Sequence, residues 1–343
     1  MKLLVSGGLG FIGSNFVRHV LAKHRTWQVV NLDLCTYAGN PDNLKDLASD
    51  RRYRWVRGDV ADPEAAGKAM EGAEAVVHFA AESHVDRSLE DASAFLRTNV
   101  IGTHVMADTA RRLGIKRFLH VSTDEVYGSV SKGLSREADP LNPSSPYAAS
   151  KAASDLIARA AFITHGLGVV ITRSSNNFGP YQYPEKALPL LITNLLDDLQ
   201  FPLYGDGRHV RDWLYVLDHA RALEHILMKG VAGDYYNIGG NFQCSNRELV
   251  SRVLRLMGKP ESLVRSVPDR VGHDRRYALD SRKLLKLGFK HSFTFEEALR
   301  QTVEWYRTCQ SWWRGLKREG GYKAYYERQY GRRLEQSKPA ALS

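Results

Sequence analysis

The sequence is poor in cysteine. Its 343 residues include only three, Cys35, Cys244 and Cys309, at wide spacings and in no Cys-x-x-Cys pair. This number and spacing exclude a disulfide framework and a cysteine-based zinc or redox motif. Free thiols are typical of a reducing compartment, so we expect a cytoplasmic protein.

Long apolar runs are missing as well. No stretch approaches the roughly 20 apolar residues that a membrane span requires, and the first residues lack the apolar core of a secretory signal. Hydrophobic residues nevertheless make up 43% of the chain, too many for a disordered protein. We expect a globular protein without a membrane partner, built as one large α/β unit or two domains.

Acidic residues are outnumbered: 48 Lys and Arg stand against 38 Asp and Glu, a net charge of +10. A nucleic-acid binder would cluster its cations among aromatic residues, whereas an enzyme for anionic small molecules needs a few arginines in a cleft. Much of the excess follows Trp313, which favours a solvated basic tail. We expect no nucleic-acid partner and no metal site.

Short apolar runs alternate with helical patterns in the first half of the chain. The runs predict strands at 3–5, 29–32, 53–56, 75–79, 118–121 and 168–171, and the helical patterns include 11–24, 63–71, 90–113 and 146–165. Such alternation is typical of a parallel sheet covered by helices on both faces. The expected fold is therefore α/β, a doubly wound parallel sheet of the Rossmann type.

The pattern changes after about Arg173. Residues 176–184 are rich in Asn, Gly, Tyr and Pro, and helical patterns follow at 186–199, 215–229, 246–257 and 294–315. We expect a second, smaller α+β domain. The predicted division is 1–175 for cofactor binding and 176–343 for substrate binding, with a segment near 213–239 returning to the sheet.

A glycine-rich loop follows the first predicted strand. Gly7 permits a tight turn, Gly10 lets the backbone approach a pyrophosphate, and Gly13 allows close packing of the helix on the strand. The helix N-terminus then offers N–H groups to the phosphates. The spacing is GxxGxxG, which indicates a dinucleotide site.

Acidic residues end the next two strands. Asp33 ends the second strand, where a carboxylate binds the ribose hydroxyls. Leu34 follows it, with no cation for a 2′-phosphate, so NAD is favoured over NADP. Asp59 follows the third strand and either meets the adenine or caps the helix at 63–71.

Tyr147 and Lys151 form a Tyr-x-x-x-Lys pair on the predicted helix 146–165. Residues four apart share a helix face, so the phenol and the ammonium can point into one site. A neighbouring ammonium favours the phenolate and would lower the pKa of Tyr147. The tyrosine would then remove a hydroxyl proton as hydride leaves the same carbon.

Thr123, Asp124 and Glu125 end the fifth strand, at the edge of a doubly wound sheet where ligands bind. Thr123 would hydrogen-bond the same sugar hydroxyl as Tyr147. The adjacent acids are either an acid–base pair or capping residues in a turn.

Further segments extend these motifs. They are Thr123–Gly128 (TDEVYG), Arg173–Tyr181 (RSSNNFGPY), Pro184–Lys186 (PEK), Ala80–Ser88 (AAESHVDRS), Arg211–Trp213 (RDW) and 269–277 (DRVGHDRRY). Together they resemble the extended short-chain dehydrogenase/reductases, and among them the dTDP-glucose 4,6-dehydratase family, over nearly the whole chain to about Tyr330.

The resemblance implies an NAD-dependent dehydration of dTDP-glucose in three steps. Tyr147, with Lys151, removes the O4 proton while hydride leaves C4. Glu125 then removes the C5 proton, and Asp124 protonates the departing C6 hydroxyl. Thr123 orients the sugar, and hydride returns to C6. The product is a 4-keto-6-deoxy sugar nucleotide.

The resemblance also implies two sets of binding residues and a homodimer. The cofactor set is Gly7, Gly10, Phe11, Ile12, Gly13, Asp33, Thr36, Asp59, Val60, Ala80, Tyr147 and Lys151. The substrate set is Ser83, Thr123, Asn176, Lys186, Arg211, Asn246, Arg270 and Tyr330. His273 is added to it because its position near Arg270 would let it face the phosphates.

Two alternatives remain. A nucleotide-sugar 4-epimerase or decarboxylase of the same fold uses the Tyr–Lys oxidation but does not need the Asp124–Glu125 pair. A nucleic-acid-binding protein would use the basic C-terminal segment and show steep salt dependence. The residues leave open whether the base is thymine or uracil.

Overall fold

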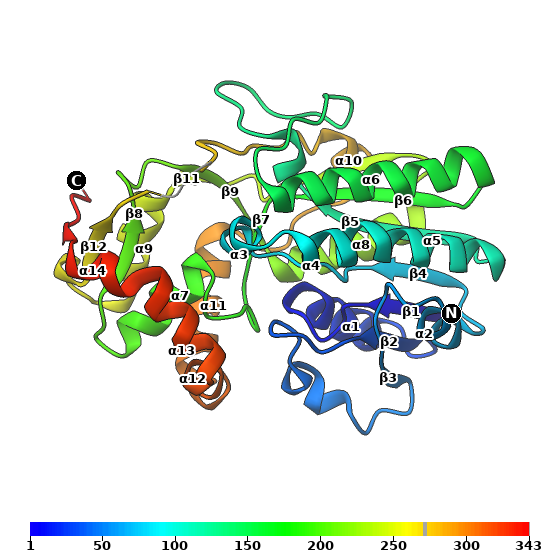
Figure 1. The fold of residues 1–343 in the computed structure, drawn as a ribbon, viewed down its shortest axis with the longest axis horizontal. Helices are drawn as coiled ribbons and strands as arrows, with labels where there is room; N and C mark the ends of the chain where they lie inside the picture. Colours follow the sequence, from blue (N-terminus) through cyan, green and yellow to red (C-terminus); the bar gives the residue numbers. More distant parts are fainter. Residues whose placement is uncertain (270–272, 343) are drawn as a thin grey trace.

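The computed structural model describes residues 1–269 and 273–342. Figure 1 shows two parts side by side: a large sheet between helices on the right, and a smaller part on the left that carries the C-terminus.

The large part is built on a seven-stranded sheet in the order β10-β6-β5-β4-β1-β2-β3, with every neighbouring pair parallel. The strands are β1 Lys2–Ser6, β2 Gln28–Asp33, β3 Tyr53–Arg57, β4 Ala75–His78, β5 Arg117–Thr123, β6 Val169–Ser174 and β10 Tyr235–Ile238. The order reverses between β1 and β4, which opens a crevice at the carboxyl ends of these strands. The predicted doubly wound sheet is confirmed.

Helices cover both faces of this sheet. They are α1 Phe11–Lys23 and α8 Val216–Lys229 on one face, and α2 Pro63–Met70, α5 Gly102–Arg112 and α6 Pro146–His165 on the other. Successive residues of a strand point to opposite faces. Leu3 and Val5 therefore pack under the first pair of helices and Leu4 under the second set, all three fully buried.

Helix α6 has the predicted bounds because its ends carry clear signals. The Ser145 hydroxyl accepts the backbone N–H of Ala148 at 3.1 Å, and Pro146 is the first helical residue. Gly166 ends the helix in the left-handed conformation (φ +69°). These caps hold Tyr147 and Lys151 in the first two turns.

The predicted helix 90–113 is confirmed over 93–112, which is a continuous helical run, but its first residues are wrong. The segment forms α3 Val85–Glu90, α4 Ser93–Phe95, a π-helical turn Leu96–Ile101 and α5. Asp91 is extended (φ −150°), and its carboxylate accepts the backbone N–H of Ser93 at 2.8 Å. This local hydrogen bond ends one helix and starts another.

The smaller part contains two three-stranded sheets around a core of its own. The strands are β7 Asn176–Phe178, β9 Val210–Tyr215 and β11 Gln243–Ser245 in one sheet, and β8 Phe201–Tyr204, β12 Val264–Val267 and β13 Lys338–Pro339 in the other. Its helices are α7 Ala187–Leu196, α9 Asn246–Met257, α11 Phe295–Thr308, α12 Gln310–Arg318, α13 Gly320–Tyr326 and α14 Arg332–Glu335. The α+β character is as predicted.

The chain crosses between the two parts more than once. After β9 it returns as α8 and β10, and β10 pairs with β6 at the edge of the large sheet. Helix α10 (Arg282–Lys286) packs on β10. Parts of the second half of the chain thus belong to the large sheet. The assignment of 1–175 to cofactor binding and of 176–343 to substrate binding stays a prediction.

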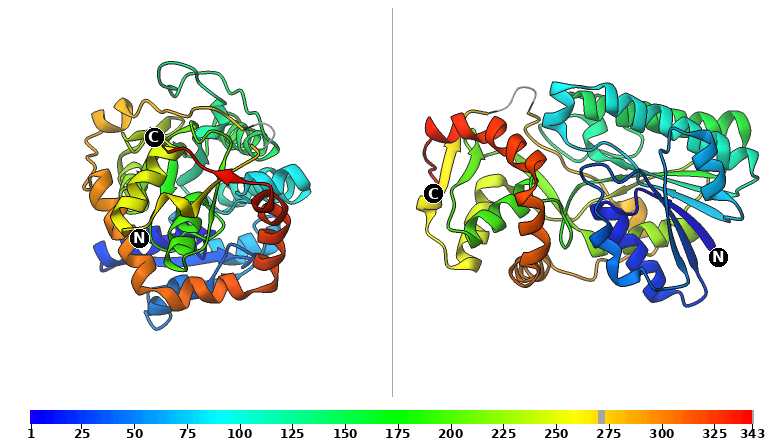
Figure 2. Two further views of the ribbon diagram at one scale, coloured as in Figure 1. Left: turned by 90° about the vertical axis from the view of Figure 1, so that its left-hand side faces the viewer. Right: turned by 60° about the horizontal axis from the view of Figure 1, so that its bottom comes forward.

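The cations after Trp313 are mostly exposed, as predicted, but the segment is not an unpacked tail. Trp313, Tyr322, Tyr325 and Tyr330 are 0–5% exposed, and the helices that carry them, red in Figure 2, pack against the rest of the protein. The aromatic residues between the cations face inward, so the segment is amphipathic. Among the described helices, none has both the length and the apolar character that crossing a bilayer requires.

Candidate active site

The loop between β1 and α1 packs its backbone tightly against neighbouring backbone and leaves the start of α1 open. Gly7 has φ +73°, and a Cβ there would lie 2.7 Å from the Ala80 backbone nitrogen. A Cβ on Gly13 would lie 2.3 Å from the carbonyl oxygen of Gly7. Helix α1 begins with Gly10 as N-cap, without a side-chain cap or an acid in its first turn. The helix N-terminus is therefore open to a pyrophosphate, and the loop fits a dinucleotide.

Asp33 lies where the ribose hydroxyls are expected. Its carboxylate oxygens accept the backbone N–H groups of Leu9 at 2.9 Å and Cys35 at 2.8 Å. Burial raises the pKa of this carboxyl, although both hydrogen bonds oppose the shift. The bonds fix the carboxylate at the mouth of the glycine loop.

Asp59 does not cap the following helix. Its carboxylate accepts the backbone N–H of Ala61 at 2.8 Å and pairs with Arg97 at 2.8 Å. The cap of α2 is Asp62, which accepts the backbone N–H of Glu64 at 2.9 Å. The capping alternative for Asp59 is therefore wrong, and Asp59 lines the cavity described next.

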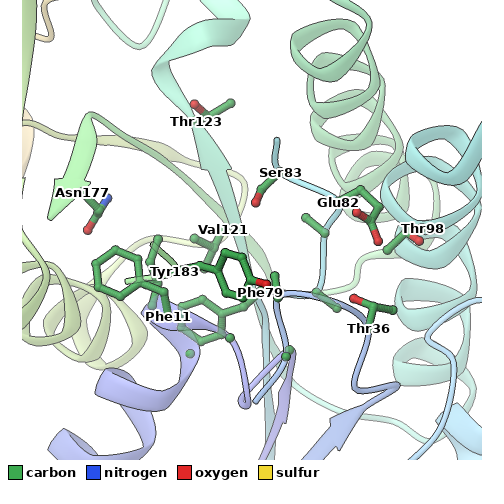
Figure 3. A pocket seen from close by; sticks show the side chains of 18 of the residues that line it. Phe11, Thr36, Phe79, Glu82, Ser83, Thr98, Val121, Thr123, Asn177 and Tyr183 are labelled. Atoms are coloured by element: carbon green, nitrogen blue, oxygen red, sulfur yellow. The ribbon is translucent and has the colours of Figure 1, made fainter. Parts of the chain in front are cut away.

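A cavity of about 320 Å³ opens beside the glycine loop. It is lined by every residue of the predicted cofactor set: Gly7, Gly10, Phe11, Ile12, Gly13, Asp33, Thr36, Asp59, Val60, Ala80, Tyr147 and Lys151. Thr123, Asp124 and Glu125 line it too. In Figure 3, Thr123 at the end of its strand, Ser83 and Glu82 on one side and Asn177 and Tyr183 on the other surround one space.

A second cavity, of about 190 Å³, adjoins the first. Four predicted substrate residues line the second cavity and not the first: Arg211, Asn246, His273 and Tyr330. Five residues line both cavities: Ser83, Glu125, Asn176, Glu185 and Lys186. A ligand can therefore extend from the reactive groups into the smaller part of the protein. The remaining predicted substrate residue, Arg270, lies outside the described residues.

The end of β5 carries the adjacent acids. Thr123 caps the short helical turn Asp124–Tyr127, accepting the backbone N–H of Glu125 at 3.3 Å. Asp124 is 3% exposed, and its Oδ2 atom has no hydrogen-bond partner among the residues that the structure describes. Burial, with the charges of Glu125 and Asp212, raises the pKa of Asp124 well above its usual range. Asp124 is therefore suited to hold a proton and give it to a ligand.

The Tyr147–Lys151 pair differs electrostatically from the prediction. Burial, and then the charge of Glu125, raises the pKa of Tyr147 instead of lowering it. Burial lowers the pKa of the Lys151 ammonium to about 8. Lys151 Nζ donates to the carbonyl oxygen of Val121 at 2.9 Å, so the ammonium is held by the backbone of β5. For the pKa of Tyr147, the increase caused by burial is therefore larger than the decrease predicted from the neighbouring ammonium.

Sequence reasoning missed several lining residues. Tyr37, Glu82, Thr98, Tyr183 and Glu185 all line the first cavity. Tyr37, Glu82 and Glu185 lie inside or next to segments that the sequence analysis had already assigned to the binding site. Their place in the sequence could therefore have identified them as lining residues.

Among the described residues, one group of possible metal ligands reaches the second cavity through His273. His209 and His273 stack at 3.7 Å, and their ring nitrogens lie 3.2 and 2.7 Å from the two carboxylate oxygens of Asp269. The Asp269 carboxylate thus contacts both imidazoles, and these contacts explain why the three side chains lie together without requiring a metal ion.

The comparisons with known proteins agree with this geometry. The sequence model of the GDP-mannose 4,6 dehydratase family matches residues 4–302. A dTDP-glucose 4,6-dehydratase of Streptomyces niveus is 50% identical, covering 92% of this chain and 96% of that protein. One of Xanthomonas campestris is 46% identical, covering 93% and 97%.

Solved structures agree as well. DesIV, a dTDP-glucose 4,6-dehydratase of Streptomyces venezuelae crystallised with NAD, has a TM-score of 0.91 and 51% identity, covering 92% of this chain and all of that one. A UDP-glucose 4-epimerase of Thermus thermophilus in complex with NAD has a TM-score of 0.83 and 31% identity, covering 90% and 100%. The fold is shared by enzymes of both reaction types.

Proposed function

This chain belongs to the dTDP-glucose 4,6-dehydratases within the GDP-mannose 4,6-dehydratase family, and we propose that Thr123, Asp124, Glu125, Tyr147 and Lys151 perform the dehydration. The enzyme converts dTDP-glucose to dTDP-4-keto-6-deoxyglucose, a step of deoxysugar biosynthesis, and its cofactor is NAD. The observation that carries the assignment of residues is that the buried Asp124 and the partly buried Glu125 line one cavity with Tyr147.

The glycine loop, Asp33 and the rest of the predicted cofactor set hold NAD in the first cavity. When bound, NAD supplies the hydride acceptor for C4 and the hydride that C6 later receives. Tyr147 removes the O4 proton, with Thr123 orienting that hydroxyl. Lys151, anchored on the carbonyl of Val121, keeps a positive charge near the phenol.

The acid pair then carries out the elimination. The C4 ketone acidifies the neighbouring C5–H bond, and the Glu125 carboxylate accepts that proton. Asp124, whose pKa is raised by burial, donates its proton to the departing C6 hydroxyl, and water leaves. When C6 receives the hydride, Glu125 returns a proton to C5, which completes the 4-keto-6-deoxy sugar. Neighbouring groups of opposite protonation state suit this step because one must take a proton while the other gives one.

The second cavity receives the nucleotide diphosphate. Arg211 is buried, its guanidinium held by the carbonyl oxygens of Val210 and Asp274, both at 2.9 Å, and by the ring of Tyr277 at 4.5 Å. A guanidinium fixed in this way is preorganised for a phosphate. Asn176, Lys186, Asn246, His273 and Tyr330 complete the site, and Arg270 is assigned by family resemblance alone.

The second candidate function is 4-epimerisation, because the epimerase named above has the same fold. Purified enzyme incubated separately with dTDP-glucose and UDP-glucose distinguishes the two. We expect a 4-keto chromophore in alkali, formed faster from dTDP-glucose, with loss of the C6 hydroxyl. Conversion to a C4 epimer without water loss would contradict the dehydratase assignment.

A homodimer through the α5–α6 face is the second part of the proposal. Large apolar side chains on this face are at least half exposed: Leu96, Ile101, Leu156 and Ile163 at 50–64%. We expect Ile163→Asp, and Leu156→Asp, to shift the sedimenting species from dimer to monomer, because a charge in a buried apolar interface is costly. Leu199→Asp, at an exposed apolar residue of the smaller part, is the matched control. A wild-type monomer at micromolar concentration would contradict the dimer.

The three cysteines support a reducing compartment. Cys35, Cys244 and Cys309 are all free, as expected for a cytoplasmic enzyme.

A further inference from the structure

Arg87 of helix α3 lies where four distant segments of the chain meet. Its guanidinium carbon lies 3.9 Å from the ring centre of Tyr37 and 4.8 Å from that of Tyr325. One of its terminal nitrogens donates to Glu185 Oε2 at 3.1 Å. The cation is thus held between the loop after β2, which carries Tyr37, the loop before α7, which carries Glu185, and helix α13, which carries Tyr325.

The partners of Arg87 belong to both cavities. Tyr37 lines the cofactor cavity, and Glu185 lines both cavities. The side chain of Glu185 is 1% exposed, so its charge depends on the nearby cations of Arg87 and Lys186. Lys186 follows directly and donates to the carbonyl oxygen of Ser83 at 3.0 Å. A displacement of Arg87 would therefore be felt in both cavities.

The reaction gives this contact a purpose. One NAD molecule acts first as oxidant and then as reductant within a single turnover. If it dissociated between these two steps, the dehydrated sugar would receive no hydride and the reaction would stop. Groups that bind the cofactor more tightly while the second cavity is occupied would prevent that loss.

We propose that Arg87 is a positioning residue that couples the two cavities, so that occupancy of the nucleotide-sugar site tightens the hold of the protein on NAD. The ion pair to Glu185 transmits the state of the second cavity, and the stacked ring of Tyr37 transmits it to the first. The inference rests on the proposed function, because it takes NAD and a dTDP-sugar as the two ligands.

The test measures NAD affinity by calorimetry on cofactor-depleted enzyme, with and without saturating dTDP. In the wild type we expect dTDP to tighten NAD binding severalfold. Arg87→Met keeps the aliphatic stem but removes the charge and the planar group. We expect it to weaken NAD binding by roughly tenfold, as expected for the loss of a partly buried cation–π contact, and to abolish the effect of dTDP. Arg87→Lys restores the charge and part of the coupling.

Arg328→Met is the matched control. Arg328 pairs with Glu90 through two 3.0 Å hydrogen bonds, so it also joins α3 to the C-terminal segment, but it lines neither cavity. It should leave NAD affinity and coupling unchanged. An equal loss in Arg328→Met would mean that the contact only holds the fold together.

Two further results would overturn the proposal: no effect of dTDP on NAD binding in the wild type, or full coupling in Arg87→Met. If Arg87→Met fails to fold in a thermal melt, Tyr37→Leu tests the same link from the cofactor side and should lose the coupling. These binding measurements need no turnover. A wild-type enzyme that couples the two ligands but does not dehydrate dTDP-glucose would contradict the proposed function alone.

Discussion

Glu125→Gln is expected to slow the formation of dTDP-4-keto-6-deoxyglucose strongly while oxidation at C4 continues. The amide has the size of the carboxylate but cannot accept the C5 proton. Removing a positioned general base costs about 10²- to 10⁴-fold in rate, and we expect the rate of product formation to fall by that factor. The measurement is the alkaline chromophore of the product, together with incorporation of solvent deuterium at C5, which should disappear.

Asp124→Asn separates the two halves of the elimination. It removes the proton donor for the C6 hydroxyl but leaves Glu125 in place, so deuterium should still enter C5 while water loss slows by a similar factor. Normal water loss in Glu125→Gln would show that another group is the C5 base. Loss of C5 exchange in both variants would show that the acids act only as a unit.

Tyr147→Phe is expected to block the first step. The ring still fills its place against Phe95, whose centroid lies 6.3 Å away, but no phenol remains to take the O4 proton. We expect turnover of dTDP-glucose to fall by about 10²- to 10⁴-fold with little change in substrate affinity. Both kcat and NAD binding are measured, because a binding defect would lower the rate for another reason.

Tyr215→Phe is the control for this variant. Tyr215 is also buried and donates to Gln301 Oε1 at 3.0 Å, but it lines neither cavity. It should lose some stability and keep its turnover. If Tyr147→Phe oxidises the sugar at the normal rate, Tyr147 is not the base.

The sequence predicts the sheet well because the signals for it are local. Most strands of the large sheet are short apolar runs, and α6 is bounded by Ser145, Pro146 and Gly166 within the chain itself. Motifs at the ends of β1, β2 and β5 meet in one cavity because parallel strands place their carboxyl ends at one edge. Fold and candidate residues could therefore be predicted together.

What the sequence does not reveal depends on long-range packing. The amphipathic C-terminal segment is recognisable only once its aromatic residues have a surface to cover, and Arg87 acquires its role from residues about 50, 100 and 240 positions away. The raised pKa of Tyr147 has the same origin, since burial is a property of the assembled site.

The two adjoining cavities, joined by five shared residues, keep the groups that recognise the nucleotide apart from the groups that react with the sugar. Substitutions confined to the outer walls of the second cavity can change which nucleotide carries the sugar without altering the groups that break its bonds. Specificity for a different nucleotide sugar can therefore evolve by single substitutions in the second cavity, while the catalytic residues of the first cavity stay the same.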